Sequence, residues 1–302
     1  MTSGVLILSG PTASGKTELA IALAKEFGGE IIGADSRQIY RGMPVGTAAP
    51  SEAQMHEVPH HLVGFLDPRE RYSAAAFVTD ALSAIAEIRS RAKLPIVSGG
   101  TGFYIRALCG DVNLAGARDE VLRARLAREA LVHSPETMHE WLAALDPARA
   151  RAMRSSDRYR VARALEVALA ARSERLTPDA ARRTLRSEGI PFVKTYLELP
   201  FAELENRFAQ RVDRMLADGL LEEAERLGNS AVAADAVGYP QALAYLRGFS
   251  TYAELRMQLY RATRRYAKRQ VTWFRSEPGL LRIASADAYD QVAALIRANR
   301  WP

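Results

Sequence analysis

Short apolar runs, each followed by a polar or glycine-containing turn, recur along the first hundred residues of the chain. Residues Val5–Leu8, Glu30–Ala34 and Leu94–Ser98 have the length and apolar character of buried strands. A helical pattern follows the first run, and the segment 74–91 places apolar side chains at helical spacing before the third. This alternation predicts an α/β fold in which helices cover both faces of a parallel sheet.

The middle of the chain has a different pattern. From about residue 113 to 190, helix-forming Ala, Arg, Leu and Glu dominate, and prolines divide the stretch into separate helices. At Phe192–Leu199 a strand pattern returns, and the chain after it reads as several helices. We therefore expect an α/β core made from residues 1–112 and 191–302, interrupted by a helical insertion at residues 113–190.

Composition narrows the class of protein. The 302 residues are 48% hydrophobic and 25% charged, which is typical of a globular protein and excludes a disordered or low-complexity chain. The net charge of +6 is uneven, because residues 1–150 carry 15 basic and 17 acidic side chains and the remainder carries 26 and 18. The second half, at +8, suits a polyanionic partner, although an arginine-rich composition explains the charge equally well.

The single cysteine, Cys109, excludes an intramolecular disulfide and a cysteine-based zinc site, and we interpret it as a small buried side chain. The first ten residues contain a short apolar run without a preceding basic segment, which favours a strand over a signal peptide. No apolar stretch approaches the roughly 18 residues that a membrane-spanning helix needs. We expect a cytoplasmic protein with no membrane association.

A phosphate-binding motif follows the first predicted strand. The residues GPTASGKT fit the P-loop pattern G-x-x-x-x-G-K-[ST] between a strand and a helix, which predicts a P-loop NTPase-like core. In such a loop, backbone N–H groups and a helix N-terminus surround an anion, Lys16 supplies charge, and the Thr17 hydroxyl suits Mg²⁺. The predicted pyrophosphate-binding residues are Gly10, Pro11, Thr12, Ala13, Ser14, Gly15, Lys16 and Thr17.

A carboxylate is absent where P-loop phosphoryl-transfer enzymes usually have one, because Leu94–Ser98 is followed by Gly-Gly-Thr. The best-placed acid is Asp35, 19 residues after Lys16, at the carboxyl end of the second predicted strand. Ligands of open α/β sheets collect at that edge, which makes Asp35 a candidate catalytic group. The alternative is a structural Asp that caps a turn.

Several ordered segments resemble the tRNA dimethylallyltransferases, also called tRNA isopentenyltransferases. They are GPTASGKT, the D-S-x-Q-x-Y block at residues 35–40, MPVGTAAP, DPRERYSAAAF, Gly99-Gly100-Thr101 with Tyr104, the D-x-x-R-x-x-R-A-L-E-like block at 157–166, the arginine-containing segment 207–219, Val237-Gly238-Tyr239 and the K-R-Q-x-T-W-F-R block at 268–275. Together they extend over residues 10–276 and are highly specific.

The resemblance implies transfer of a dimethylallyl group from dimethylallyl pyrophosphate to the exocyclic amine of an adenosine in tRNA. In this family the target lies just 3′ of the anticodon, in tRNAs that read codons beginning with U. The implied partners are therefore the anticodon stem-loop of tRNA and dimethylallyl pyrophosphate, and the implied cofactor is Mg²⁺.

The resemblance also implies catalytic roles for Thr12, Asp35 and Arg211. An exocyclic amine is a weak nucleophile, so a carboxylate that orients it and accepts its proton assists the reaction, a role that suits Asp35. Arg211 would stabilise the departing pyrophosphate together with the P-loop. Without the resemblance, Arg207 and Arg211 would be read as a solvated helix face, and the role of Arg207 stays open.

The resemblance places a larger set of residues against tRNA: Asp35, Ser36, Arg37, Gln38, Thr101, Arg123, Tyr159, Arg160, Val161, Ala162, Arg163, Val237, Gly238, Tyr239, Pro240 and Gln241. Gln38 has a donor and an acceptor that suit the edge of adenine. Arg160 and Arg163 are open to a second interpretation as helix-surface charges. The basic and aromatic segment 256–275 suits RNA or an amphipathic core helix about equally.

Three positions depart from the family pattern. Ala49 stands where a lysine is common, Ser156 where asparagine is usual, and Pro240 where a basic residue is expected. These changes would reduce the positive charge that faces tRNA, whereas all of the predicted catalytic residues are present. The pair His60-His61 invites a metal interpretation, but adjacent residues chelate one ion poorly, so we favour structural roles.

Three other functions remain as alternatives. A P-loop small-molecule kinase would explain the phosphate-binding loop but not the Asp35 block or the basic second half. An adenylate isopentenyltransferase acting on free AMP shares the chemistry, although the basic half favours a macromolecular acceptor. An RNA-binding protein without activity is disfavoured because Lys16, Thr17, Asp35 and Arg211 are all present. We expect a monomer.

Overall fold

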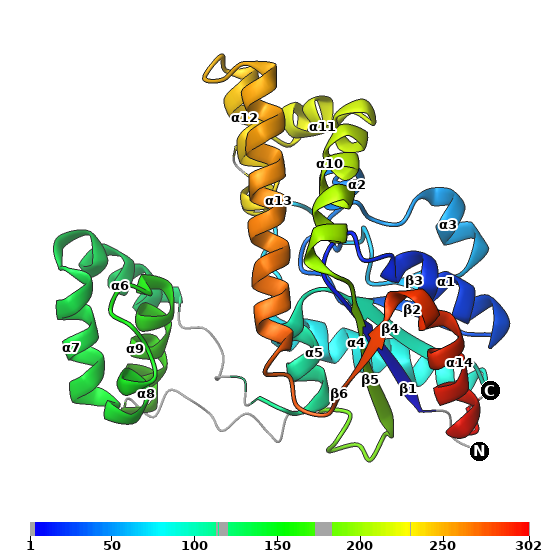
Figure 1. The fold of residues 1–302 in the computed structure, drawn as a ribbon. Helices are drawn as coiled ribbons and strands as arrows, with labels where there is room; N and C mark the ends of the chain where they lie inside the picture. Colours follow the sequence, from blue (N-terminus) through cyan, green and yellow to red (C-terminus); the bar gives the residue numbers. More distant parts are fainter. Residues whose placement is uncertain (1–3, 113, 115–119, 173–182, 230, 302) are drawn as a thin grey trace. The chain divides into compact units, whose positions relative to one another are not determined.

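A computed structural model of the chain describes residues 4–112, 114, 120–172, 183–229 and 231–301 (Figure 1). Within these residues, six strands form one sheet in the order β3-β2-β4-β1-β5-β6, and every neighbouring pair is parallel. The strands are β1 Val5–Ser9, β2 Glu30–Gly33, β3 His60–His61, β4 Pro95–Gly99, β5 Phe192–Glu198 and β6 Leu280–Ala284. The predicted parallel sheet is confirmed, and the carboxyl ends of β2, β4 and β1 are neighbours.

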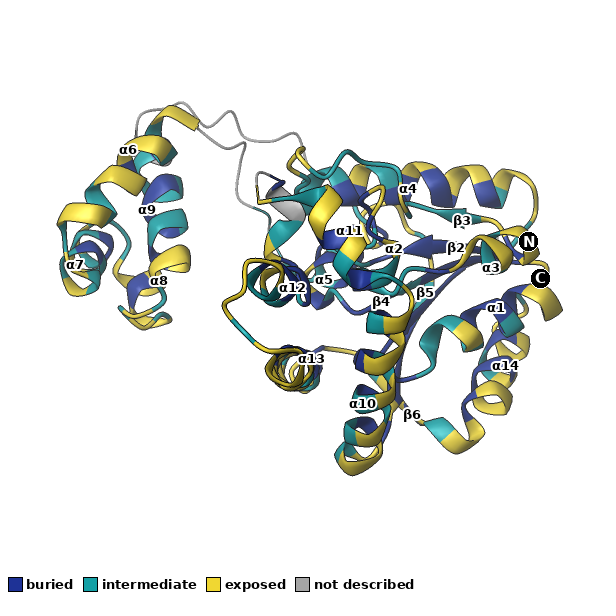
Figure 2. Cartoon of the chain, turned by 90° about the horizontal axis from the view of Figure 1, so that it is seen from above, coloured by how far each residue is buried: buried dark blue, intermediate teal, exposed yellow. Residues whose placement is uncertain are grey.

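Helices cover both faces of the sheet (Figure 2). One cluster of buried side chains joins Leu6 and Leu8 of β1 to α1, α10 and α14. Because side chains alternate along a strand, Val5 and Ile7 point to the other face, where α4 contacts β2 and β4. The helices of this unit are α1 Lys16–Glu26, α2 Pro44–Thr47, α3 Glu52–Glu57, α4 Ala74–Ser90, α5 Gly102–Cys109, α10 Phe201–Ala217, α11 Leu220–Leu227, α12 Tyr239–Leu246, α13 Tyr252–Phe274 and α14 Ala288–Ala298, with 3₁₀ turns η1 Val232–Asp235 and η2 Ser285–Asp287.

The sequence patterns do not predict two of the strands, β3 and β6. Because β6 follows β5 after the insertion, the expectation of a single strand there is wrong. The two residues of β3, His60 and His61, are too few to show any periodicity. The other, β6, lies at the opposite edge of the sheet and buries only Ile283 of its five side chains. Edge strands of this kind lack the continuous apolar run that identifies β1, β2 and β4.

The inserted segment forms its own compact unit, Asn113–Arg182. Its helices are α6 Glu120–Val132, α7 Pro135–Leu145, α8 Pro147–Arg151 and α9 Arg158–Arg172. Leu126, Leu142 and Leu165 belong to its separate apolar core. The Ser134 hydroxyl caps α7 by accepting the N–H of Thr137 at 3.2 Å, because a helix N-terminus leaves such groups without partners. Of the prolines expected to divide this stretch, Pro135 and Pro147 begin α7 and α8, and Pro178 lies outside the described residues.

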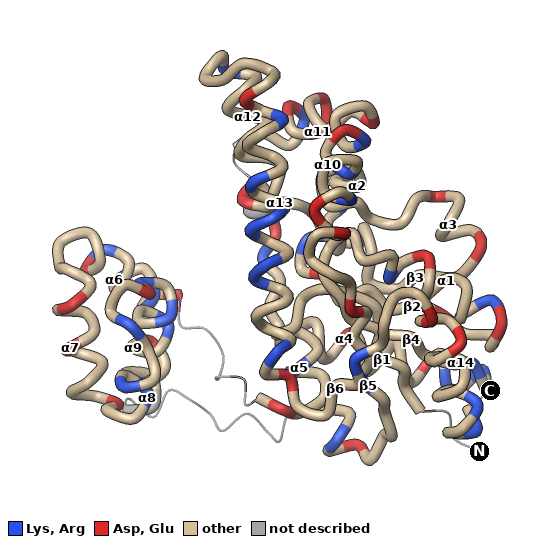
Figure 3. The backbone as a smooth tube through the Cα atoms, in the orientation of Figure 1, with Lys and Arg blue, Asp and Glu red and all other residues tan. Residues whose placement is uncertain are grey.

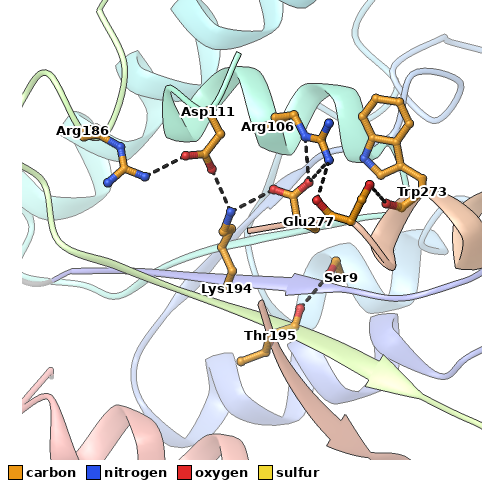
Figure 4. A network of polar contacts seen from close by, with 9 residues as sticks. Ser9, Arg106, Asp111, Arg186, Lys194, Thr195, Trp273 and Glu277 are labelled. Atoms are coloured by element: carbon orange, nitrogen blue, oxygen red, sulfur yellow. Dashed lines mark hydrogen bonds and ion pairs between the residues drawn. The ribbon is translucent and has the colours of Figure 1, made fainter. Parts of the chain in front are cut away.

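Residues 183–190 belong to the core unit and not to the insertion, which corrects the predicted boundary at residue 190. The N–H of Leu185 donates to the carbonyl of Leu108 at 2.8 Å, and Arg186 pairs with Asp111 at 2.7 Å. Figure 4 shows this pair joined to the buried amine of Lys194 on β5, which lies 2.8 Å from Asp111 and 2.9 Å from Glu277. The two chain segments that lead to the insertion are therefore tied together on the sheet.

A second apolar cluster lies beyond the carboxyl edge of the sheet. Its buried members include Ile39 and Met43 after β2, Leu220 of α11, Tyr239 of α12 and Leu255 of α13. The long helix α13 begins at a capping box, in which Thr251 and Glu254 satisfy each other's backbone N–H groups. This packing holds α2, α10, α11, α12 and α13 around the ends of β1 and β2 (Figure 1).

Candidate active site

A cavity of about 820 Å³ opens at the carboxyl edge of the sheet. Its walls come from the loop after β1, the turn after β2, the α2 segment and the helices α10 and α13. The residues that line it include Thr12, Lys16, Thr17, Asp35, Gln38, Thr47, Arg207, Arg211, Tyr266 and Gln270. The structure therefore brings all three predicted catalytic residues, Thr12, Asp35 and Arg211, to one cavity.

The loop between β1 and α1 has the geometry of a phosphate cradle. Ala13 and Gly15 both adopt left-handed backbone conformations, with φ of 64° and 88°, which curve the chain around an anion-sized space. The hydroxyl of Ser14 is buried and has no hydrogen-bond partner among the described residues. Because a buried hydroxyl without a partner is costly, the loop is adapted to a ligand that would accept its hydrogen bond.

Two cations face the cradle from different elements. Lys16, at the start of α1, donates to the carbonyl of Pro11 at 3.3 Å, and Arg211 of α10 donates to the carbonyl of Thr47 at 3.3 Å. Burial lowers the pKa of Lys16 to about 8, with Asp35 opposing that change and Arg211 adding to it. Burial likewise lowers the pKa of Arg211. Two partly desolvated cations held close together favour a multiply charged anion between them.

Asp35 lies at the turn that follows β2. Its Oδ1 accepts the N–H of Arg37 at 2.9 Å and that of Gln38 at 3.4 Å, which leaves Oδ2 without a hydrogen bond among the described residues. Thr101, at the end of β4, holds the same turn by accepting the N–H of Ser36 at 3.0 Å. The capping interpretation of Asp35 is therefore correct for one oxygen, while the side chain still lines the cavity.

Gln38 is tied to the α2 segment on the far side of the cavity. Its amide nitrogen donates to the carbonyls of Thr47 at 3.2 Å and Ala48 at 2.9 Å. Both acceptors are carbonyls, which settles the orientation of the amide group. Only the Gln38 oxygen is left to face a ligand, so a role at the adenine edge is limited to accepting a hydrogen bond.

Sequence patterns miss two cavity residues of α13, Tyr266 and Gln270. The Gln270 side chain accepts the N–H of Thr12 at 2.8 Å and donates to the carbonyl of Gly100 at 3.1 Å, which joins the P-loop to the end of β4. Burial raises the pKa of the Tyr266 phenol, and Asp35 adds to the rise. Gln270 stands in the K-R-Q block, but only the packing of α13 shows that it points inward.

The predicted tRNA-facing segment 237–241 divides into different roles. Val237 lines the cavity and Pro240 is exposed, whereas Gln241 accepts the N–H of Gly238 at 3.0 Å and caps α12. Tyr239 has no exposed surface, and its hydroxyl donates to Glu223 at 2.7 Å. The prediction that the Tyr239 side chain contacts tRNA is therefore wrong, because a fully buried ring cannot reach RNA.

The predicted residues of the helical unit also differ in accessibility. Tyr159 is 66% exposed and Arg160 is exposed, so both can meet a ligand. Val161 is buried in the core of that unit, which corrects the prediction for its side chain. Arg163 contacts the buried Glu166, and Arg123 lies 3.7 Å from Glu120. Ala162 is half-buried.

Lys and Arg residues recur along α13 (Figure 3). Arg256 pairs with Asp213 at 2.6 Å and Arg264 with Glu205 at 2.5 Å, so these two charges are compensated. Arg261, Arg265 and Lys268 are exposed and form no ion pair within the described part of the chain. Of the aromatic residues, Phe274 is buried and Trp273 packs against the guanidinium of Arg106 within the protein, as in the core interpretation.

The donor set suits a magnesium ion bound together with a pyrophosphate. Mg²⁺ takes oxygen ligands and usually binds through a few protein oxygens plus phosphate oxygens and water. The Thr17 hydroxyl lines the cavity at the first turn of α1, beside the cradle. The adjacent histidines His60 and His61 lie away from the cavity, on β3, where His61 contacts the carboxylate of Glu30 at 2.7 Å.

Comparisons with known proteins agree with this geometry. A family model described as IPP transferase matches residues 38–277, and a second, described as isopentenyl transferase, matches residues 3–69. The chain belongs to the IPP transferase family. Its parallel α/β core with a P-loop-like turn is consistent with the fold of this family, and the family assignment made from the motifs is confirmed.

The relatives cover nearly the whole chain. The tRNA dimethylallyltransferase of Geobacter sulfurreducens is 39% identical over 96% of this chain and 95% of its own length. That of an Anaeromyxobacter species is 44% identical over 96% and 97%. A tRNA isopentenylpyrophosphate transferase from Bacillus halodurans has a similar crystal structure, with a TM-score of 0.70, 34% identity and coverage of 98% and 96%. A eukaryotic dimethylallyltransferase, described as acting on tRNA, gives a TM-score of 0.77 at 25% identity, covering 98% of this chain and 78% of that one.

Proposed function

We propose that this IPP transferase moves the dimethylallyl group of dimethylallyl pyrophosphate onto the exocyclic amine of an adenosine in tRNA. The target is the nucleotide 3′-adjacent to the anticodon in tRNAs that read codons beginning with U. The observation that carries the proposal is the meeting of Lys16, Arg211 and Asp35 in one cavity beside the P-loop. Its relatives, curated as tRNA dimethylallyltransferases, support the same activity.

The reaction needs a base and a stabilised leaving group. The adenosine nitrogen forms a bond to the allylic carbon while the bond from that carbon to the pyrophosphate oxygen breaks. The amine then loses a proton, which the free oxygen of Asp35 accepts. The Asp35 oxygen that is bonded to Arg37 and Gln38 fixes the carboxylate, so that the second oxygen presents its lone pairs to the cavity.

The departing pyrophosphate is held by the P-loop, Lys16 and Arg211. Charge that develops on a leaving group is stabilised best by donors already in position, and both cations are fixed by bonds to backbone carbonyls. Mg²⁺, held through the Thr17 hydroxyl and the pyrophosphate oxygens, would supply further positive charge. Thr12 lies in the same loop, with its backbone fixed by Gln270.

Access of the adenosine to Asp35 requires that the base leave the stacked anticodon loop. The exposed cations of α13 and the exposed Tyr159 and Arg160 of the helical unit support contact with the surrounding RNA. Two departures from the family pattern at accessible positions, Ala49 and Pro240, would reduce the positive charge available to it. No helix within the described ranges has both the length and the apolar character needed to cross a membrane.

One incubation tests the proposal. The protein, Mg²⁺, dimethylallyl pyrophosphate and an unmodified tRNA with adenosine at the target position are combined, and the digested nucleosides are analysed by mass spectrometry. We expect isopentenyl-adenosine at that single position, and no product from a tRNA with guanosine there. Product from free AMP but from no tRNA would identify an adenylate isopentenyltransferase instead. Phosphoryl transfer from ATP without prenyl transfer would identify a kinase.

A further inference from the structure

A buried carboxylate outside the cavity wall controls the segment that carries two cavity carbonyls. Glu223 of α11 is 1% exposed. Its Oε2 accepts the N–H of Val45 at 2.9 Å, and its Oε1 accepts the N–H of Gly46 at 2.7 Å and the hydroxyl of Tyr239 at 2.7 Å. Both oxygens are thus occupied by donors, and two of the three donors belong to the backbone of α2.

The α2 helix needs this carboxylate because it has no N-terminal cap of its own. It is four residues long, and Met43, at the capping position, has no side chain that can accept a hydrogen bond. The first N–H groups of a helix lack intrahelical partners, and a carboxylate near them is favourable. Glu223 supplies that acceptor from a helix far away in the sequence. Tyr239 packs so closely that a Cβ on Gly46 would lie 2.5 Å from its ring.

The other end of α2 faces the cavity. The carbonyl of Thr47 accepts hydrogen bonds from Arg211 at 3.3 Å and Gln38 at 3.2 Å, and the carbonyl of Ala48 accepts one from Gln38 at 2.9 Å. Ala48 has φ of 46°, a conformation unfavourable for alanine that turns its carbonyl toward Gln38. The position of these two carbonyls therefore depends on how α2 is held at its start.

We propose that Glu223 is a positioning residue for the transfer reaction, which orients Arg211 and Gln38 through the α2 segment. Burying a carboxylate is costly, and here the cost is offset by three hydrogen bonds that define where α2 lies. Glu223 does not line the cavity, so its effect on the reaction passes through the Thr47 and Ala48 carbonyls. The inference rests on the proposed function for the roles of Arg211 and Gln38.

The test compares Glu223→Gln with Glu225→Gln, an exposed neighbour on the same helix with the same charge change. The glutamine amide offers one acceptor oxygen and places donors against donors, so α2 loses its anchor. We expect the affinity for inorganic pyrophosphate and the kcat for tRNA prenylation to fall by about 10- to 100-fold in Glu223→Gln. In Glu225→Gln we expect both to stay within about 2-fold.

A double variant separates positioning from general destabilisation. If Glu223 acts through Arg211, adding Glu223→Gln to Arg211→Gln lowers pyrophosphate affinity by no more than about 3-fold further, because the two effects share one path. A full further loss in the double variant would overturn the proposal. The proposal would also be overturned if the loss of pyrophosphate affinity in Glu223→Gln equals the fraction of protein that thermal denaturation shows to be unfolded.

A second measurement applies even if Glu223→Gln does not fold. In the unmodified chain, saturation with inorganic pyrophosphate should slow hydrogen exchange of the α2 amides by about 10-fold, because the anion fixes Arg211 against Thr47. In Arg211→Gln this protection should disappear, and protection that persists there would contradict the coupling. Pyrophosphate binding does not require tRNA, so these results stand apart from the prenylation assay, whose failure with the unmodified chain would refute the proposed function alone.

Discussion

The cavity and the helical unit 120–172 both carry cations, but they hold them in opposite ways. In the cavity, Lys16 and Arg211 are desolvated, bonded to backbone carbonyls and near the carboxylates of Asp35 and Glu18. In the helical unit, Arg160 is exposed and, among the described residues, pairs with Asp157, three residues before it, at 3.4 Å. A buried group has few alternative partners, whereas an exposed charge is screened by water and salt. We therefore expect individual charged groups to determine what the cavity does, whereas on the helical unit we expect the number of exposed charges to matter.

The largest effect expected from this comparison is that of Asp35→Asn. Asparagine keeps the oxygen that accepts the N–H of Arg37 but cannot accept the amine proton, so the turn persists and the base is lost. We expect kcat to fall by about 10³-fold, within the usual range for a general base. Rapid-quench assays of product measure kcat, and filter binding checks that tRNA affinity changes by less than about 3-fold. Near-normal turnover would remove Asp35 from the chemistry.

Loss of Arg211 should rank second. Arg211→Gln removes one cation from the pyrophosphate site and leaves Lys16 and the P-loop, so we expect kcat/KM for dimethylallyl pyrophosphate to fall by about 100-fold. Arg207, one turn earlier on α10, is the comparison residue, because it also lines the cavity but pairs with Glu203 at 2.6 Å and donates to the carbonyl of Ala13 at 3.4 Å. Arg207→Gln should cost less than about 10-fold in the same steady-state assay. Equal losses in both variants would show that α10 contributes only its summed charge.

A smaller effect is expected at Gln270, whose side chain accepts a hydrogen bond from the P-loop backbone. Gln270→Leu leaves the buried N–H of Thr12 and the carbonyl of Gly100 without a partner. We expect the free energy of unfolding to fall by about 2 kcal/mol and pyrophosphate affinity by about 10-fold. Urea denaturation and calorimetry measure the two quantities. The neighbouring exposed Arg269→Leu provides the control, and unchanged stability in Gln270→Leu would contradict the predicted support.

The smallest single effects should come from the helical unit. Arg160→Ala and Tyr159→Ala are each expected to weaken tRNA binding by about 3- to 10-fold without changing pyrophosphate affinity. The slope of log affinity for tRNA against log salt should decrease by about 1 for Arg160→Ala and remain unchanged for Tyr159→Ala, which carries no charge. Val161→Ala should lower stability and leave the slope unchanged. A loss of kcat in Arg160→Ala as large as that in Asp35→Asn would contradict the inferred difference between the cavity and the helical unit.

Local patterns were sufficient for the central strands and for the phosphate cradle. The strands β1, β2 and β4 are almost entirely buried, so each contains a short apolar run, Val5–Leu8, Ile31–Ile32 and Ile96–Val97. The P-loop is equally local, because its conformation depends on neighbouring residues between one strand and one helix. Asp35 could also be placed, since the carboxyl end of a parallel strand determines the edge at which the next residue lies.

Local patterns failed where a residue's role depends on a distant partner. Tyr239 stands in a motif that resembles a tRNA-contacting segment, yet its hydroxyl bonds to Glu223 in the core. Val161 lies between Arg160 and Ala162 in an arginine-rich segment but faces the apolar core of the helical unit. The sequence patterns did not predict strand β6, because its edge position leaves four of its five side chains at least partly exposed. In each of these three cases the surroundings, and not the residue type, decide exposure.

The sequence alone determined the α/β core, the helical insertion, the P-loop and the family to which the chain belongs, because each is encoded in short segments or in their order along the chain. Only the tertiary structure showed that Gln270 supports the P-loop, that Glu223 holds α2, and that the insertion ends at Arg182. The contacts that show this join positions separated by 75, 177 and 258 residues. No periodicity in the sequence reports such distances, since they arise only when helices pack around the sheet.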